Sequence, residues 1–213
     1  MSFDRLARHY RWMEFVLAGG LLQRARTVWL PEVPTTRRAL LLGEGNGRFL
    51  GPALAALPDA TFHCVDASGG MLEQASRAVS DENRNRVTFE VASLPDWRPT
   101  SGSFDLVVTN FFLDCFPSTE LPRVMAVIAD AISTKAAWLL TDFAIPTGRW
   151  RKVRAQLIHQ AMYTFFRWST KIRARRLIAP EPLLSDLGFE RQAVREFEWG
   201  LVRSSLWRRI DRA

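Results

Sequence analysis

Three glycines at alternate positions, followed by an acidic residue at the end of the next apolar run, form the pattern in this sequence that is best suited to chemistry. Gly43, Gly45 and Gly47 follow a run of leucines, and Asp66 comes 23 residues after Gly43. Glycine costs backbone entropy wherever it stands, so three within five positions indicate that another group approaches the backbone closely. An acidic residue about 20 residues beyond such a turn is placed to accept hydrogen bonds from two ribose hydroxyls. The alternative is a plain tight turn, with Asp66 as the cap of the following helix.

Short apolar runs alternate with helical patterns through the middle of the chain, and they place the turn and the acid at strand ends. The predicted strands are 38–42, 61–65, 87–91, 104–110 and 136–143, and the predicted helices between them are 48–57, 70–80 and 120–132. This alternation is typical of a parallel sheet wrapped by helices, so we predict a single α/β domain with a doubly wound sheet. Ligands bind at the carboxyl ends of the strands in such sheets, where Gly43 and Asp66 stand.

The order of the glycines separates two kinds of cofactor site. A dinucleotide fingerprint requires a glycine at position 48, for close helix packing beneath a pyrophosphate, but this position is Arg48. The pattern G-x-G-x-G instead resembles the first motif of class I S-adenosylmethionine-dependent methyltransferases, whose cofactor has no phosphate. The resemblance implies that S-adenosylmethionine lies with its methionine part against the backbone of Gly43, Glu44, Gly45, Asn46 and Gly47.

The resemblance continues along most of the chain. "VDASGGML" (65–72) resembles the second motif, "VASLPDW" (91–97) the stretch after the third strand, and "FDLVVTNFFLDCF" (104–116) the fourth motif. It implies a ribose contact by Asp66, a floor of the site that includes Asn110, and further cofactor contacts by Ala67, Met71, Ser93 and Leu94. The segment 188–207 resembles the closing hairpin of that superfamily. This implies a mostly parallel, seven-stranded sheet with helices on both faces and an antiparallel last strand.

Two positions depart from the superfamily's pattern. Many members have an acidic residue two places before the first glycine, but this chain has Leu41 there. Glu44 is either its substitute as the partner of the cofactor's ammonium group or a side chain that points to solvent. Ser93 stands where an aspartate is common, so we expect a weaker contact with the adenine, or one made by the backbone.

Three side chains are candidates for a catalytic role. Methyl transfer is an in-line displacement at a sulfonium, so it depends mainly on alignment and exclusion of water, and a base is needed only where the attacking atom carries a proton. Asp114 follows the fourth strand inside an apolar run, where a carboxylate without a partner is costly. Its alternative role is a helix cap. Tyr10, on a predicted first helix (3–25), and His159, in an aromatic helical segment, are the other candidates, with surface or core positions as their alternatives.

The net charge of +7 is unevenly distributed. Residues 39–146 include 7 basic and 13 acidic residues, whereas residues 147–180 include 9 basic and no acidic ones. We predict capping helices over 1–37, a cofactor-binding core over 38–146, a basic aromatic helical lid over 147–180 and a closing β-hairpin over 181–213. The lid's aromatic residues suit a small acceptor that is apolar or aromatic, and also a peripheral contact with a membrane surface. The alternative is a helix that simply packs on the sheet.

Composition limits the remaining classes. The longest uncharged part of the Trp-rich region, 155–166, has 12 residues, short of the roughly 20 apolar residues that span a bilayer. Cys64 and Cys115 have no metal-ligand spacing, which predicts reduced thiols, no metal and a cytoplasmic location. The basic flanks leave a nucleic-acid methyltransferase as an alternative function, although no recognisable RNA-binding module is appended. The departures at Leu41 and Ser93 leave a non-catalytic S-adenosylmethionine-binding protein as another.

Overall fold

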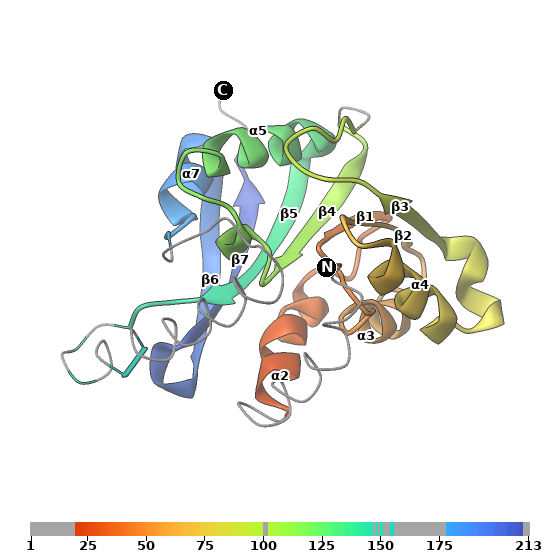
Figure 1. Cartoon of the computed structure of the whole chain (residues 1–213), viewed down its shortest axis with the longest axis horizontal. Helices are drawn as coiled ribbons and strands as arrows, with labels where there is room; N and C mark the ends of the chain where they lie inside the picture. The colour runs from red at the N-terminus through yellow and green to blue at the C-terminus, as the bar shows by residue number, and fades with distance from the viewer. Residues whose placement is uncertain are drawn as a thin grey trace.

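The computed structural model describes residues 20–99, 102–146, 148, 150, 154–155 and 178–210 (Figure 1). Its strands are β1 (Arg38–Leu42), β2 (Thr61–Asp66), β3 (Val87–Val91), β4 (Phe104–Asn110), β5 (Ile132–Phe143), β6 (Phe189–Phe197) and β7 (Val202–Arg209). Its α-helices are α2 (Leu21–Thr27), α3 (Leu50–Ala56), α4 (Gly69–Ala78), α5 (Leu121–Ala131) and α7 (Glu181–Asp186). Short 3₁₀ turns are η2 (Leu30–Glu32), η3 (Asp81–Arg86), η4 (Leu113–Cys115) and η5 (Glu198–Gly200). All eight strands and helices that we predicted between residues 38 and 143 are confirmed.

The strands form one seven-stranded sheet in the order β3-β2-β1-β4-β5-β7-β6. The first five strands in that order pair in parallel, whereas β7 runs antiparallel to both β5 and β6. This confirms the predicted doubly wound sheet with its antiparallel last strand. Chain order reverses direction at β1, because β2 and β3 lie on one side of it and β4 on the other. A crevice for a ligand is expected at the carboxyl ends of the strands on either side of such a reversal.

Strand β1 shows how the sheet separates two cores. Ala39 and Leu41 face one side, where they belong to the same cluster as residues of α3 and as Trp29. Leu40 and Leu42 face the other side, where they belong to the same cluster as residues of α5 and α7. Successive side chains of a strand point to opposite faces, so the four apolar residues in a row, 39–42, need cover on both. Helices accordingly lie on both faces of the sheet (Figure 1).

Strand β5 begins four residues earlier than predicted, directly after α5. Ile132 pairs with Phe104 of β4, and the register shifts between Phe104 and Leu106. Thr134 and Lys135 in this first part are exposed. These polar residues interrupt the apolar run, so the sequence pattern starts only at Ala136.

Helix α2 joins the glycine turn to the end of β5. Gln23 Nε2 donates to the Arg48 carbonyl at 2.8 Å, and Thr141 Oγ1 donates to the Ala25 carbonyl at 3.3 Å. The predicted first helix up to residue 19 and nearly all of the predicted lid lie outside the described residues, so the four-part division of the domain stays a prediction. Within the described ranges, every helix is too short or too polar to span a membrane.

Candidate active site

The glycine turn after β1 adopts a backbone that glycine takes up readily and other residues do not. Gly43, Gly45 and Gly47 have φ values of 65°, 63° and 84°. A Cβ atom at Gly43 would collide with the Phe112 ring, and one at Gly47 would lie 3.2 Å from the backbone of Ala75 in α4. At these two positions the group that approaches the glycine backbone is therefore part of the protein itself.

Asp66 ends β2 and ties the turn to the next motif. Its Oδ2 accepts a hydrogen bond from the Gly45 amide at 3.0 Å, and its Oδ1 accepts one from the Ser68 amide at 2.8 Å. Burial raises the pKa of this carboxyl, and the two hydrogen bonds oppose the rise. The side-chain cap of α4 is Ser68, whose Oγ accepts from the Met71 amide at 3.3 Å. The alternative of Asp66 as that cap is therefore wrong. A carboxylate has about four acceptor sites, so roughly two stay available for hydroxyl groups.

Glu44, inside the turn, points back to the protein. Its Oε1 accepts from the amides of Phe49 and Leu50 at 2.9 and 2.8 Å, so it satisfies two free amides at the start of α3. Burial raises the pKa of Glu44 to about 7, although these hydrogen bonds and the charge of Arg26 lower it. The alternative of a solvent-facing Glu44 is therefore wrong, and its contact with a cofactor ammonium stays a prediction.

The segments that follow β2 and β3 lie side by side, as the predicted adenine contacts require. The Ala92 amide donates to the Asp66 carbonyl at 3.1 Å and so joins them. The predicted contact residues differ in exposure: exposed are Ala67 and Ser93, and half-buried are Asn46, Met71 and Leu94. Their contacts with a cofactor stay predictions.

Beyond β4 the chain turns sharply and sends two phenylalanines to different places. Phe111 has a φ of 54°, and its ring centroid lies 5.0 Å from that of Phe143 and 5.0 Å from the Arg26 guanidinium carbon. Phe112 packs over Gly43 instead. Directly before them, both polar atoms of the Asn110 side chain are buried without a hydrogen-bond partner among the described residues. Buried polar atoms are normally paired, so this amide is available to a ligand.

Asp114 lies in η4, in the apolar setting that the sequence predicts. Its Oδ1 accepts a hydrogen bond from the Cys115 thiol, whose Sγ lies 3.6 Å away. Burial raises the pKa of Asp114 to about 6. The N-cap residues of η4 and α5 are Phe112 and Glu120, so Asp114 caps neither helix. A buried carboxyl with a raised pKa beside a crevice is suited to accept a proton near neutral pH.

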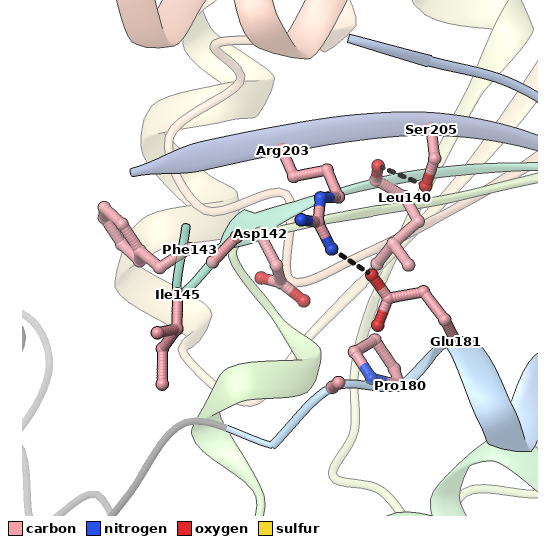
Figure 2. A pocket seen from close by; sticks show the side chains of 10 residues that line it. Leu140, Asp142, Phe143, Ile145, Pro180, Glu181, Arg203 and Ser205 are labelled. Carbon is pink, nitrogen blue, oxygen red and sulfur yellow. Dashed lines mark hydrogen bonds and ion pairs between the residues drawn. The ribbon is translucent and has the colours of Figure 1, made fainter. Parts of the chain in front are cut away.

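A pocket at the end of β5 contains three charged side chains that the sequence analysis did not single out. They are Asp142 of β5, Glu181 of α7 and Arg203 of β7 (Figure 2). Arg203 donates to Glu181 at 3.1 Å and to Glu196 at 3.0 Å. Burial, followed by the charges of Asp114 and Glu181, raises the pKa of Asp142 well above its usual range. Asp142 stands near the end of a predicted strand, so the strand-end rule was the signal that pointed to it. Glu181 and Arg203 had no such signal.

The other two catalytic candidates, Tyr10 and His159, lie outside the described residues. So does most of the predicted lid, of which the structure describes Gly148, Trp150, Arg154, Ala155 and residues 178–180. The roles of Tyr10, His159 and the lid stay predictions.

Comparisons with known proteins agree with this geometry. Residues 39–135 match the family model described as a methyltransferase domain. Demethylmenaquinone methyltransferase from Roseiflexus sp. (strain RS-1) is 33% identical over 113 residues, which is 52% of this chain and 46% of that protein. The chain thus spans about half the length of this curated relative.

Solved structures share the fold at low sequence identity. The mitomycin 7-O-methyltransferase MmcR is 16% identical with a TM-score of 0.71, over 99% of this chain and 61% of that one. An S-adenosylmethionine-dependent methyltransferase from Mesorhizobium loti is 21% identical with a TM-score of 0.64, over 87% of this chain and 96% of that one. Phosphoethanolamine N-methyltransferase 2 from Haemonchus contortus, solved with S-adenosylhomocysteine, is 21% identical with a TM-score of 0.66, over 91% and 43%.

Proposed function

We propose that this chain is a class I S-adenosylmethionine-dependent methyltransferase, which its match to a methyltransferase domain supports, and that it transfers a methyl group from S-adenosylmethionine to a small acceptor that is apolar or aromatic. The observation that carries the proposal is the glycine turn held by Asp66. The turn places three glycines with positive φ at the end of β1, and the Asp66 carboxylate anchors the Gly45 amide at 3.0 Å.

The residues at the strand ends fit the cofactor. Asp66 keeps acceptor sites for two ribose hydroxyls after its bonds to Gly45 and Ser68. The orphaned Asn110 amide, at the end of the adjacent strand β4, supplies both a donor and an acceptor to a polar group of the ligand. The cofactor supplies the electrophilic methyl group when it is bound, and the protein's part is to align the acceptor and exclude water.

The acceptor's place is the end of β4 and β5. Two ring pairs lie there, Phe111 with Phe143 and Phe112, which also packs over Gly43, with Phe116, and such rings suit an apolar or aromatic molecule. Asp114 stands beside them, and its pKa of about 6 leaves it mostly ionised at pH 7. It orients the acceptor or accepts the proton that the attacking atom loses.

Exposed apolar side chains support a lipophilic acceptor and a peripheral contact with a membrane surface as part of this proposal. Trp150 is 86% exposed and Trp199 is 68% exposed, and the Arg154 guanidinium carbon lies 5.2 Å from the Trp199 ring centroid. Aromatic and basic residues together favour a lipid interface. Cys64 and Cys115 carry free thiols, which supports a cytoplasmic location.

The test is direct detection of methyl transfer. The protein is incubated with methyl-labelled S-adenosylmethionine and a metabolite or lipid extract, and labelled products are identified by mass spectrometry. We expect one dominant small-molecule product, which also identifies the atom that is methylated. Asp66→Ala serves as the control, because it removes the ribose acceptor and should remove most of the label. Label that appears only in RNA or DNA contradicts the proposed acceptor class.

A further inference from the structure

Asp142 is a buried carboxylate without a hydrogen bond from the part of the chain that the structure describes. Its side chain is 5% exposed, and both carboxylate oxygens lack a partner there. The Phe112 amide acts on this carboxyl as a weak backbone hydrogen bond and opposes the rise in the pKa of Asp142, but its geometry falls short of a full hydrogen bond with either oxygen. Leaving a buried carboxylate unpaired is costly, so the arrangement calls for a donor from outside these residues.

Neighbouring charges make the place electronegative. Asp142 faces Asp114 from η4 and Glu181 from α7, and its charge also acts on the Cys115 thiol. Arg203 is the cross-strand neighbour of Asp142, yet its guanidinium is occupied by Glu181 and Glu196. The single positive charge of Arg203 is therefore shared among several carboxyl groups. The second oxygen of Glu181, Oε2, is also buried without a partner within the described ranges.

The pocket at this point has room for a small group. Its volume is about 120 Å³, roughly four times the share of one water in the liquid. Figure 2 shows Asp142 pointing into the space between Arg203, Pro180 and Glu181. Apolar walls come from Leu140, Phe143 and Ile145, which belong to the same strand as Asp142 or follow it directly. The site thus joins an acidic floor to apolar sides.

We propose that this pocket binds the protonated amine of the methyl acceptor, with Asp142 as the principal partner of the ammonium group and the Glu181 Oε2 oxygen as the second. An ammonium group supplies up to three donors and no acceptor, which matches three orphaned carboxylate oxygens. A neutral hydroxyl would satisfy one oxygen but would not favour the ionised form of Asp142, as an ammonium group does. This inference rests on the proposed function, since it names a chemical class for the acceptor.

The raised pKa of Asp142 predicts a second observable effect, a dependence of amine binding on pH. In the free protein its carboxyl holds a proton at pH values where an ordinary aspartate is ionised. An ammonium group favours the ionised form, so the proton leaves when the amine binds. Affinity should therefore rise with pH as long as the amine stays protonated, and binding should release protons to the buffer.

The test uses 2-phenylethylamine and its neutral analogue 2-phenylethanol as probes of the 213-residue chain. Binding is followed by ligand-observed NMR at pH 6 and pH 8, with and without S-adenosylhomocysteine. We expect the amine to bind at least ten-fold more tightly than the alcohol at pH 8, and less tightly at pH 6. Calorimetry in buffers of different ionisation enthalpy should show proton release with the amine and none with the alcohol.

Variants test whether the amine binds in this pocket or elsewhere on the protein surface. Asp142→Asn should weaken the amine at least ten-fold and leave the alcohol unchanged, and Glu181→Gln should weaken it less. Asp186→Asn, an exposed aspartate at the end of α7, is the matched control and should change neither probe. Equal affinity of the two probes overturns the inference, as does amine binding that survives Asp142→Asn. If Asp142→Asn does not fold, Asp142 has a partner within the chain, and that outcome also overturns it.

The same samples distinguish the two proposals. S-adenosylhomocysteine that binds to a protein without preference for the amine refutes the amine pocket alone. Selective amine binding in a protein that ignores S-adenosylhomocysteine refutes the methyltransferase function and keeps the pocket.

Discussion

Two neighbouring parts of the sheet's carboxyl-terminal edge differ in whether their polar side chains have hydrogen-bond partners. At the cofactor edge, formed by the ends of β1 and β2, Asp66 and Glu44 each accept two backbone hydrogen bonds. At the acceptor edge, formed by the ends of β4 and β5 with their following turns, Asn110 and Asp142 have orphaned polar atoms among the described residues.

The difference separates polar groups that stabilise the fold from polar groups that are available to a ligand. The carboxylates of the cofactor edge hold the glycine turn and start α3, so they serve the structure before any cofactor arrives. The polar groups of the acceptor edge serve no such bond, and burial raises the pKa of Asp142 well above its usual range. Such unpaired groups are retained at functional sites, where a bound molecule supplies the missing partner.

The largest effect is expected for a substitution at the acceptor edge. Asp114→Asn should lower the turnover number by about 10²-fold, the usual scale for loss of a general base, while cofactor affinity stays unchanged. In the wild type, kcat/KM should rise as pH passes through the pKa of Asp114, about 6, because a base acts in its ionised form. The variant should lack that rise. The measurements are steady-state kinetics between pH 5 and pH 8 and calorimetry with S-adenosylhomocysteine.

Stability supplies the control for this variant. The folded pKa of Asp114 lies above its ordinary value of 3.8, so its contribution to stability is present below that value and lost as pH rises through about 6. At pH 8 the Asn variant avoids the cost of a buried charge, and its melting temperature should not fall. A variant that unfolds, yet keeps its activity per folded molecule, assigns Asp114 to structure instead.

A smaller effect is expected at the cofactor edge, and it appears in stability without any ligand. Gly47→Ala places a side chain at a φ of 84° and 3.2 Å from the Ala75 backbone, so we expect a loss of about 2 kcal/mol in the free energy of unfolding. Gly51→Ala is the matched control, because a Cβ at this helical position meets nothing within 4 Å. It should raise stability by roughly 0.5–1 kcal/mol. Urea denaturation measures both, and equal effects of the two changes contradict a preformed turn.

The sequence patterns predicted the cofactor edge better than the acceptor edge for a physical reason. The strand before the turn, the three glycines and Asp66 belong to two consecutive strands, and the parallel pairing of β1 with β2 places Asp66 beside Gly45. The pocket around Asp142 assembles residues from β5, α7 and β7, which lie up to 65 residues apart along the chain. No short-range sequence pattern indicates that such residues come together. Prediction from the sequence is also limited within the glycine motif. The capping of α3 by Glu44 depends on the direction of its side chain, which the sequence does not give.

Calorimetry with S-adenosylhomocysteine on the wild type, Asp66→Ala and Asp142→Asn tests the central claim most directly. We expect the wild type to bind in the micromolar range, on the order of −8 kcal/mol. Asp66→Ala should weaken binding by roughly 2–3 kcal/mol, because it removes two ribose hydrogen bonds together with the bond that anchors the Gly45 amide. Asp142→Asn should bind as the wild type does, because its carboxylate belongs to the acceptor edge. A protein that binds a nicotinamide dinucleotide and ignores S-adenosylhomocysteine contradicts the account, and so does a loss of affinity in Asp142→Asn as large as that in Asp66→Ala.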